Sequence, residues 1–359
     1  MAPLPFGSTI GILGGGQLGR MTAMSAARLG YHVHIFTPEK DSPAAEVSLK
    51  TTVAEWGDEG ALKSFAKSVD VVTLEFENIP FFAAETVARH CALYPSPDVL
   101  KMTQNRIREK TFINECGIKT APFAAIRSSL DAKEAALEIG TPSIMKTSEM
   151  GYDGKGQLTL REAQEADTAF ASLKTSEAIL EGFVKFTMEI SVIVARSVSG
   201  EIATFPPVHN VHKNFILHET IAPAPIDASL AAKAEKIAHT LAGNSKLIGI
   251  LAVEMFVTEE GEILVNELAP RPHNSGHWTM DGCATSQFEQ VVRAVAGLPL
   301  GPTTVLHPTR MLNLIGDEVD EAGSILAKSP SARLHLYGKK AARPGRKMGH
   351  INFLLTNNA

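Results

Sequence analysis

The chain has 359 residues, of which 44% are hydrophobic and 20% charged, with a formal net charge of -5 and an isoelectric point near 6.2. This length is too great for one ordinary hydrophobic core, so two or three domains are expected. The acidic balance argues against a nucleic-acid partner, and the lack of a signal-peptide pattern or a bilayer-length apolar stretch argues against a membrane and favours the cytoplasm.

A parallel, doubly wound α/β sheet is predicted for the first hundred residues, because apolar strand-like runs alternate with helical patterns. The expected strands cover 9–13, 31–36 and 71–76, and the expected helices cover 17–29 and 58–68. A polar stretch over 101–116 predicts one further helix, which ends at Gly117.

A small α+β module is predicted for 118–180, with a glycine-rich loop between two of its strands. Beyond it, three apolar runs predict an antiparallel sheet, and a helix is expected over 230–242. The runs cover 187–198, 201–206 and 216–222. Near the end of the chain, short strands over 310–315, 332–337 and 349–355 surround a basic loop over 338–347. Three scattered cysteines, Cys91, Cys116 and Cys283, predict free thiols.

Two glutamates lie inside apolar strand-like runs that a turn connects. Glu254 lies in the run 248–257, and Glu267 lies beside Asn266 in the run 263–268. A carboxylate inside an apolar strand is costly unless it is paired or bound to a cation, and Mg²⁺ takes one or two carboxylates plus substrate phosphates. Solvent-facing glutamates on edge strands are the alternative, but the polar segment that follows them favours a site for phosphate-bound magnesium.

The first glycine-rich turn matches the pattern G-x-G-x-x-G at Gly14, Gly16 and Gly19, between a strand and a helix. Such a turn lets main-chain N–H groups approach a phosphate at a helix N-terminus, as in dinucleotide-binding proteins. The same turn also closes βαβ units that bind no dinucleotide. A dinucleotide-dependent oxidoreductase therefore remains an alternative.

The second glycine-rich loop, 151–157, follows a strand that ends at Lys146 and precedes another strand. Because it does not lead into a helix, it is not a Walker-type loop. A strand-to-strand loop with a neighbouring lysine can close over a triphosphate. An ordinary hairpin is the alternative, and Lys146 together with the two glutamates favours the triphosphate.

Further polar residues become candidates through their positions. Arg271, His273 and Asn274 follow Glu267 in a proline-containing extended segment. The loop 338–347 carries four basic residues, Lys339, Arg343, Arg346 and Lys347. They could anchor a small phosphorylated substrate, or they could form an ordinary solvated surface. Glu189, His212 and the segment 181–184 carry little signal by themselves.

Six sequence blocks in this order resemble the N5-carboxyaminoimidazole ribonucleotide synthetase family of the ATP-grasp superfamily. The blocks are GILGGGQLGRM at 11–21, TLEFENIP at 73–80, QNRIREKTF at 104–112, GYDGKGQ at 151–157, NELAPRPHNSGHWT at 266–279 and RPGRKMGHIN at 343–352. Because GGGQLGRM alone also resembles formate-using phosphoribosylglycinamide transformylases, another ATP-grasp ribonucleotide ligase that uses formate or an amino acid is the nearest alternative. The second and fifth blocks favour bicarbonate chemistry.

The resemblance implies an ATP-grasp fold with a Rossmann-like domain over 1–103, an ATP-grasp domain over 104–297 and a small β-rich segment over 298–359. A lid module would lie within the ATP-grasp domain at about 118–185. The implied activity is carbon–nitrogen ligation in purine biosynthesis, in which ATP and bicarbonate carboxylate 5-aminoimidazole ribonucleotide on N5 through carboxyphosphate. A homodimer is implied as well.

The resemblance also implies an ATP site. Its residues would be Arg106, Lys146, Gly151, Tyr152, Asp153, Gly154, Lys155, Gly156, Gln157, Glu181, Gly182, Phe183, Val184, Glu189, His212, Asn266 and Glu267. Arg106 and Lys146 would contact the phosphates, and the loop 151–157 would cover them. The main chain at 181–184 would hold adenine, and Glu189 would take the ribose hydroxyls. Glu254 and Glu267 would hold Mg²⁺ or Mn²⁺ between the phosphates.

For the ribonucleotide, the implied residues are Gln17, Leu18, Glu75, Asn78, Tyr152, Asp153, Lys155, Lys339, Arg346 and Lys347. Asp153 would orient the exocyclic amine or accept its proton, and the three basic residues at 339–347 would hold the ribose phosphate. Arg271, His273 and Asn274 would form the bicarbonate and carboxyphosphate pocket, so that they join Tyr152, Asp153 and Lys339 as the catalytic set. Some relatives carry arginine at Lys155, a change that keeps the charge and alters the hydrogen-bond geometry.

Overall fold

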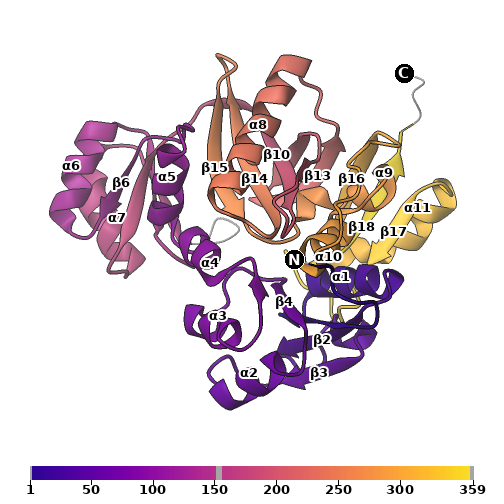
Figure 1. Ribbon diagram of the computed structural model, residues 1–359. Helices are drawn as coiled ribbons and strands as arrows, with labels where there is room; N and C mark the ends of the chain where they lie inside the picture. The colour runs from indigo at the N-terminus through magenta and orange to yellow at the C-terminus, as the bar shows by residue number, and fades with distance from the viewer. Residues whose placement is uncertain (1, 151–155, 356–359) are drawn as a thin grey trace. The chain divides into compact units, whose positions relative to one another are not determined.

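The computed structural model describes residues 2–150 and 156–355 and divides into two compact units, whose elements are labelled in Figure 1. The first unit comprises Met1–Leu100, Ile190–Val253 and Ala269–Ala359, and the second comprises Lys101–Glu189 and Glu254–Leu268. Within the described ranges, no helix is long and apolar enough to cross a membrane. The three cysteines are free, as expected.

The first unit contains the parallel sheet expected near the N-terminus, with the strand order β3-β2-β1-β4-β5. Its strands are β1 (Thr9–Leu13), β2 (His32–Thr37), β3 (Lys50–Val53), β4 (Val71–Leu74) and β5 (Leu93–Tyr94), and its helices are α1 (Gln17–Arg28), α2 (Glu59–Ala66) and α3 (Phe81–Ala88). The elements expected up to residue 76 are confirmed, whereas the sequence pattern does not predict β3, α3 or β5. Strand β3 has no fully buried residue and β5 has only two residues, so neither forms a recognisable apolar run.

A second sheet has the strand order β14-β10-β12-β13-β16-β18-β17, with β11 paired to β10, and its pairs from β12 to β17 are antiparallel. Its strands are β10 (Phe186–Arg196), β11 (Ile202–Thr204), β12 (Val208–Lys213), β13 (Ile216–Ala222), β14 (Gly249–Thr258), β16 (Thr309–Ile315), β17 (Arg333–Leu336) and β18 (Lys347–Leu354). The neighbouring helices in the sequence are α8 (Ala228–Asn244), α9 (Thr279–Gly282), α10 (Gln287–Ala296) and α11 (Ala322–Lys328). Strand β12 was not expected, because polar residues interrupt its apolar ones in VHNVHK.

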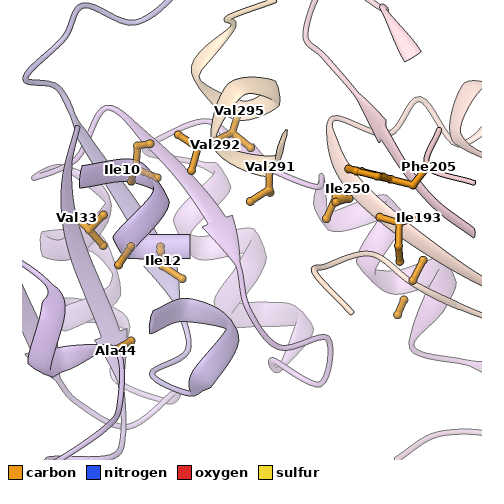
Figure 2. Close-up of a cluster of buried hydrophobic side chains, with 14 of the residues drawn as sticks. Ile10, Ile12, Val33, Ala44, Ile193, Phe205, Ile250, Val291, Val292 and Val295 are labelled. Carbon is orange, nitrogen blue, oxygen red and sulfur yellow. The ribbon is translucent and has the colours of Figure 1, made fainter. Parts of the chain in front are cut away.

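Helix α10 contributes to the largest hydrophobic core of the first unit. Figure 2 shows its valines between the side chains of the parallel sheet and those of the second sheet. The labelled members of this cluster are Ile10, Ile12, Val33, Ala44, Ile193, Phe205, Ile250, Val291, Val292 and Val295, all of them less than 5% exposed. The core therefore fixes the position of α10 within the first unit.

The second unit is built on an antiparallel sheet with the order β6-β9-β7-β8. Its elements are β6 (Phe123–Ile126), α6 (Ser129–Ile139), β7 (Ser143–Thr147), β8 (Gln157–Leu160), α7 (Ala166–Leu173) and β9 (Ala178–Gly182). These elements confirm the predicted α+β module. Strand β15 (Ile263–Ala269) pairs with β14 and confirms the hairpin expected to carry the two glutamates.

The single helix expected over 101–116 is wrong. Two helices occupy this stretch, α4 (Pro97–Thr103) and α5 (Arg106–Glu115). Asn105 between them has an extended backbone, and its side-chain oxygen accepts hydrogen bonds from the N–H groups of Ile107 and Arg108 at 3.1 Å. An asparagine N-cap of this kind starts a helix, so α5 begins at Arg106.

Candidate active site

The two glutamates of the hairpin both belong to the second unit, and both are partly buried. Arg106, the first residue of α5, places Nη1 3.5 Å from Glu267 Oε2. Burial lowers the pKa of Arg106, but nearby carboxylates, Glu267 first and Glu181 among them, outweigh this effect and raise the pKa above its ordinary value. The Glu267 side chain is 41% exposed, so its carboxylate is accessible to a ligand.

Helix α5 holds the main chain on both sides of Glu267. Glu109 Oε1 accepts a hydrogen bond from Leu268 N–H at 2.7 Å, and Lys110 Nζ donates to the carbonyl oxygen of Asn266 at 3.0 Å. Glu109 and Lys110 are each only 2% exposed. Because two consecutive buried residues bond the two neighbours of Glu267, the position of its carboxylate is strongly constrained.

Lys110 also connects this region to Lys146, the lysine that precedes the second glycine-rich loop. Glu181 Oε2 accepts a hydrogen bond from Lys146 Nζ at 2.8 Å, and Glu181 Oε1 lies 3.6 Å from Lys110 Nζ. Burial raises the pKa of Glu181, but the two lysines and Arg106 together hold it below its ordinary value. The structure thus brings Arg106, Lys146, Glu181 and Glu267 into one charge network.

The remaining candidate ATP residues are distributed over the strands. Gly182 N–H and Phe183 N–H donate to the carbonyl groups of Pro122 and Pro142 at 2.9 and 3.2 Å, so both N–H groups have partners within the second unit. Val184 follows β9, Glu189 lies on β10 and is partly buried, and His212 lies on β12 of the first unit. Gly156 and Gln157 border β8, whereas Gly151, Tyr152, Asp153, Gly154 and Lys155 lie outside the described residues.

The segment after Glu267 is held by partners that the sequence patterns do not reveal. Arg271 forms a bidentate ion pair with Glu77, in which Nη2 donates to Oε1 at 2.6 Å and Nε donates to Oε2. Burial raises the pKa of Glu77, and Arg271 more than offsets this effect and lowers it. Asn274 and Asn313 exchange amide hydrogen bonds at 2.7 and 2.9 Å, with both side chains less than 10% exposed.

Gln287, the first residue of α10, bonds both main-chain groups of His273. Its Oε1 accepts from His273 N–H at 2.9 Å, and its Nε2 donates to the His273 carbonyl at 2.7 Å. The side chain is fully buried. Glu77, Gln287 and Asn313 therefore hold the three candidate residues Arg271, His273 and Asn274, in that order. Of the three partners, only Glu77 is indicated by a sequence motif, since it lies in the block TLEFENIP.

In the first glycine-rich turn, a carboxylate of the chain itself occupies the main-chain donors. Gly16 N–H donates to Glu75 Oε1 at 2.8 Å, and Gly19 N–H donates to Oε2 at 3.1 Å. A Cβ atom on Gly14 would lie 2.4 Å from Glu75 Cγ, so the missing side chain makes room for this carboxylate. Burial raises the pKa of Glu75, although the two hydrogen bonds act in the opposite direction. The donors that a dinucleotide pyrophosphate would need are thus already used.

Around this turn, the other candidate substrate residues differ in exposure. Gln17 is the first residue of α1 and is partly exposed, and Leu18 is 8% exposed and packs with Met21, Phe288 and Tyr337. Asn78 follows β4 and is partly buried. Leu18 can therefore offer a substrate its main chain more readily than its side chain.

The basic loop of the first unit contains one lysine with an unusual environment. Lys339 Nζ donates to the Lys347 carbonyl at 2.8 Å and lies 5.7 Å from the centre of the Tyr337 ring. Burial, followed by the charge of Arg346, lowers the pKa of Lys339 to about 8. Arg346 donates to the Ala341 carbonyl at 3.0 Å, and Lys347 begins β18.

Three family models match the chain in succession. They describe a ribonucleotide synthetase preATP-grasp domain at 7–104, an ATP-grasp domain at 111–288 and a phosphoribosylaminoimidazole carboxylase C-terminal domain at 309–359. The N5-carboxyaminoimidazole ribonucleotide synthase of Bacillus subtilis is 47% identical over 348 residues, which cover 97% of this chain and 92% of that protein. The chain belongs to the N5-carboxyaminoimidazole ribonucleotide synthase family.

Solved structures of the synthase family agree with the fold. The ADP complex of an N5-carboxyaminoimidazole ribonucleotide synthetase has a TM-score of 0.95 and 46% identity, covering 99% of this chain and 95% of that one. The Aspergillus clavatus synthase with ADP and 5-aminoimidazole ribonucleotide has a TM-score of 0.91 and 32% identity, covering 98% and 94%. The ATP-grasp fold is confirmed, and the chain is an ATP-grasp ligase. The alternative of a dinucleotide-dependent oxidoreductase is wrong.

The environment of Glu109 predicts a pH-dependent stability. Burial and the charge of Glu267 raise the pKa of Glu109 to about 8, so the native state keeps a proton that an unfolded chain loses near the ordinary value of 4.5. The stabilisation by this group is therefore complete below about pH 4.5 and is lost as the pH rises through about 8. We expect Glu109→Gln, which cannot ionise, to raise the unfolding temperature of the metal-free protein at about pH 8 by about 2–4 °C and to have less effect at about pH 5.

Calorimetry of the wild type and the variant at both pH values measures this difference. Glu115→Gln provides the matched control, because Glu115 lies on the same helix and is exposed. Equal shifts for the two variants at both pH values would contradict the assignment.

Proposed function

We propose that this chain uses ATP and bicarbonate to carboxylate 5-aminoimidazole ribonucleotide on N5, with carboxyphosphate as the intermediate. The observation that carries the proposal is the charge network of the second unit, in which Arg106 and Lys146 are held beside Glu181 and Glu267. Its support from relatives is the Aspergillus clavatus synthase, whose crystal structure holds ADP and 5-aminoimidazole ribonucleotide.

On the ATP side, Arg106 and Lys146 would contact the phosphates. Fixed cations of this kind neutralise the charge of the transferred phosphoryl group, and their value lies in positions set before the reaction starts. The buried contacts of Lys110 and Glu181 supply this preorganisation, since they restrain Lys146 and the chain around Glu267. The segment 181–184 would hold adenine, Glu189 would bind the ribose, and His212 and Asn266 complete the proposed set.

Glu254 and Glu267 fit a Mg²⁺ or Mn²⁺ ion by the chemistry of their donor atoms. They supply carboxylate oxygens from the neighbouring strands β14 and β15. Among the described residues, no third His, Cys, Asp or Glu joins them in a group that could hold a metal by itself. Two carboxylates suit a metal whose other ligands come from phosphates and water. When bound, the ion would neutralise negative charge on the phosphates.

Arg271, His273 and Asn274 would bind bicarbonate and carboxyphosphate. All three are held by other residues of the first unit, so their polar groups are preorganised for an anion. The proposed substrate residues of the same unit are Gln17, Leu18, Glu75, Asn78, Lys339, Arg346 and Lys347. Tyr152, Asp153 and Lys155, which we also assign to the substrate, lie outside the described residues.

The family relationship also leads us to propose a cytoplasmic homodimer that binds no nucleic acid or membrane. The net charge of -5 accords with the lack of a nucleic-acid partner. Analytical ultracentrifugation would measure the dimer, and a monomeric mass at micromolar concentration would contradict it.

The most direct test of the function is an omission series. We expect ADP release to require ATP, bicarbonate and 5-aminoimidazole ribonucleotide together, and the N5-carboxylated product to form with it. A coupled ADP assay measures release, and labelled bicarbonate measures product. Full ADP release with formate or an amino acid in place of bicarbonate would overturn the proposed chemistry.

The metal assignment predicts that Glu267→Gln lowers ADP formation by about 100-fold or more, because a neutral amide binds Mg²⁺ far more weakly than a carboxylate. The chain should remain folded, as judged by circular dichroism. Glu259→Gln, in the exposed turn of the same hairpin, should retain wild-type turnover. Near-normal turnover of Glu267→Gln at limiting Mg²⁺ would remove the assignment.

The pKa of Lys339 near 8 predicts a pH dependence of substrate binding. The lysine is charged below this pH and neutral above it, so kcat/KM for the ribonucleotide should fall as the pH rises through about 8. Lys339→Arg keeps its charge at every accessible pH and should abolish this decline. Steady-state kinetics between about pH 6.5 and 9.5 would measure it, and an identical decline in Lys339→Arg would assign the titration to another group.

A further inference from the structure

Asn105, the N-cap of α5, belongs to none of the proposed binding sets, although it directly precedes Arg106 and is only 5% exposed. Its side chain has one oxygen that accepts hydrogen bonds and one nitrogen that donates two. A residue that only capped the helix would need the oxygen alone. The partners of the nitrogen therefore indicate a second role.

Both halves of the Asn105 amide group are in use. Its Oδ1 accepts from the N–H groups of Ile107 and Arg108, and its Nδ2 donates to Glu149 Oε1 and Glu177 Oε2, all at 3.1 Å. The hydrogen bond from Asn105 lowers the pKa of Glu177 below its ordinary value, which keeps this acceptor ionised. A reversed amide would place its nitrogen against two N–H groups and its oxygen against two carboxylates, so only one orientation fits.

The two glutamates lie at the ends of two paired strands. Glu149 follows β7, and Glu177 directly precedes β9. These strands are antiparallel neighbours, and they carry Lys146 and Glu181 of the charge network. The amide nitrogen of Asn105 thus joins the start of α5 to both strands at once.

A main-chain hydrogen bond lies beside this junction. The N–H of Arg106 donates at 2.9 Å to the carbonyl of Ser148, which is two residues beyond Lys146. Ser148 is itself held, because its N–H and its hydroxyl both donate to the Glu177 carbonyl, at 3.3 and 3.2 Å. The main chains that carry Arg106 and Lys146 are therefore connected through one buried residue, next to the Asn105 side chain.

The spacing of Arg106 and Lys146 must be set by groups other than the two side chains themselves, since two cations repel each other. Fixed cations stabilise a polyphosphate best when their positions are set before it arrives. The junction of α5 with β7 and β9 can supply this constraint, because it lies directly beside one cation and two residues from the other.

We propose that Asn105 is a positioning residue for ATP, whose amide nitrogen fixes the start of α5 against β7 and β9 so that Arg106 and Lys146 keep one spacing. Serine and aspartate cap helices as well as asparagine does, but neither supplies two donors. The assignment of the two cations to the phosphates rests on the proposed function. The connection between α5 and the strands is a property of the chain alone.

Asn105→Ser tests the proposal, because it keeps the cap and adds no charge. We expect it to weaken binding of Mg²⁺ with adenylyl imidodiphosphate, a non-hydrolysable ATP analogue, by about tenfold. Titration calorimetry of the full chain measures this affinity without bicarbonate or ribonucleotide. In steady-state kinetics, KM for ATP should rise by a similar factor, whereas KM for bicarbonate, whose proposed ligands belong to the first unit, should stay unchanged.

Ser128→Ala is the matched control for the loss of helix stability. Ser128 caps α6 in the same unit, where its side chain accepts from the N–H of Asp131. Its removal should lower the unfolding temperature and leave the affinity for the analogue unchanged. A loss of stability is thereby separated from a loss of position.

A reversal of the hydrogen bond identifies the partner. Asn105→Asp places an acceptor against Glu177 and should also weaken analogue binding. Adding Glu177→Gln restores the bond with donor and acceptor exchanged, and should return the dissociation constant to within about threefold of the wild type. Asn105→Asp with Glu134→Gln has the same net charge, but Glu134 is exposed on α6, so this pair should bind as weakly as Asn105→Asp alone.

Wild-type affinity in Asn105→Ser would overturn the proposal, and so would equal affinities of the two double variants. If the variants fail to fold, hydrogen exchange of the nucleotide-free wild type decides. The main-chain N–H of Arg106 should be protected, and exchange at the rate of an unstructured chain would overturn the proposal. A co-substrate other than bicarbonate would defeat the proposed function and leave the analogue titration valid, so the two failures are distinguishable.

Discussion

The second unit depends on the pairing of charges that are almost fully removed from water. Lys110 and Glu181 are each less than 5% exposed, and the loss of either would leave an uncompensated charge at a cost of about 3–5 kcal/mol. With Glu109 keeping its proton, the cations Arg106, Lys110 and Lys146 outnumber the carboxylates of Glu181 and Glu267. This surplus of positive charge suits a polyphosphate, so the same interactions hold the fold and prepare it for its ligand.

Much of the fold could be predicted from the sequence, because in most strands and helices the apolar residues recur at the spacing typical of that element. The elements that were not predicted have physical reasons. Polar residues interrupt the apolar ones of β12, and α5 begins at a capping asparagine inside a largely polar stretch. Most candidate site residues could be identified from the sequence blocks that resemble the family. Gln287 and Asn313 could not be found in this way, since each is one polar residue whose partner, His273 or Asn274, is defined only by the folded chain.

The glycine-rich turn near the N-terminus illustrates how one motif can support two different chemistries. Three glycines before a helix create main-chain donors and space, and neither property specifies what fills them. Here Glu75, which directly follows the neighbouring strand β4, supplies the anion from within the chain. The distinction between a dinucleotide site and this arrangement thus lies in a residue 59 positions away from Gly16.

Helix α10 joins the anion pocket to the main core of the first unit. Its first residue bonds the main chain of His273, and its valines lie in the cluster of Figure 2. The N–H of His273 can therefore exchange its hydrogen with solvent only when its hydrogen bond to Gln287 breaks. Gln287 belongs to a helix that this core holds in place. The amide hydrogen of His273 should be replaced by deuterium about as slowly as those of the interior strands, although the residue lies in an irregular segment where rapid replacement is usual.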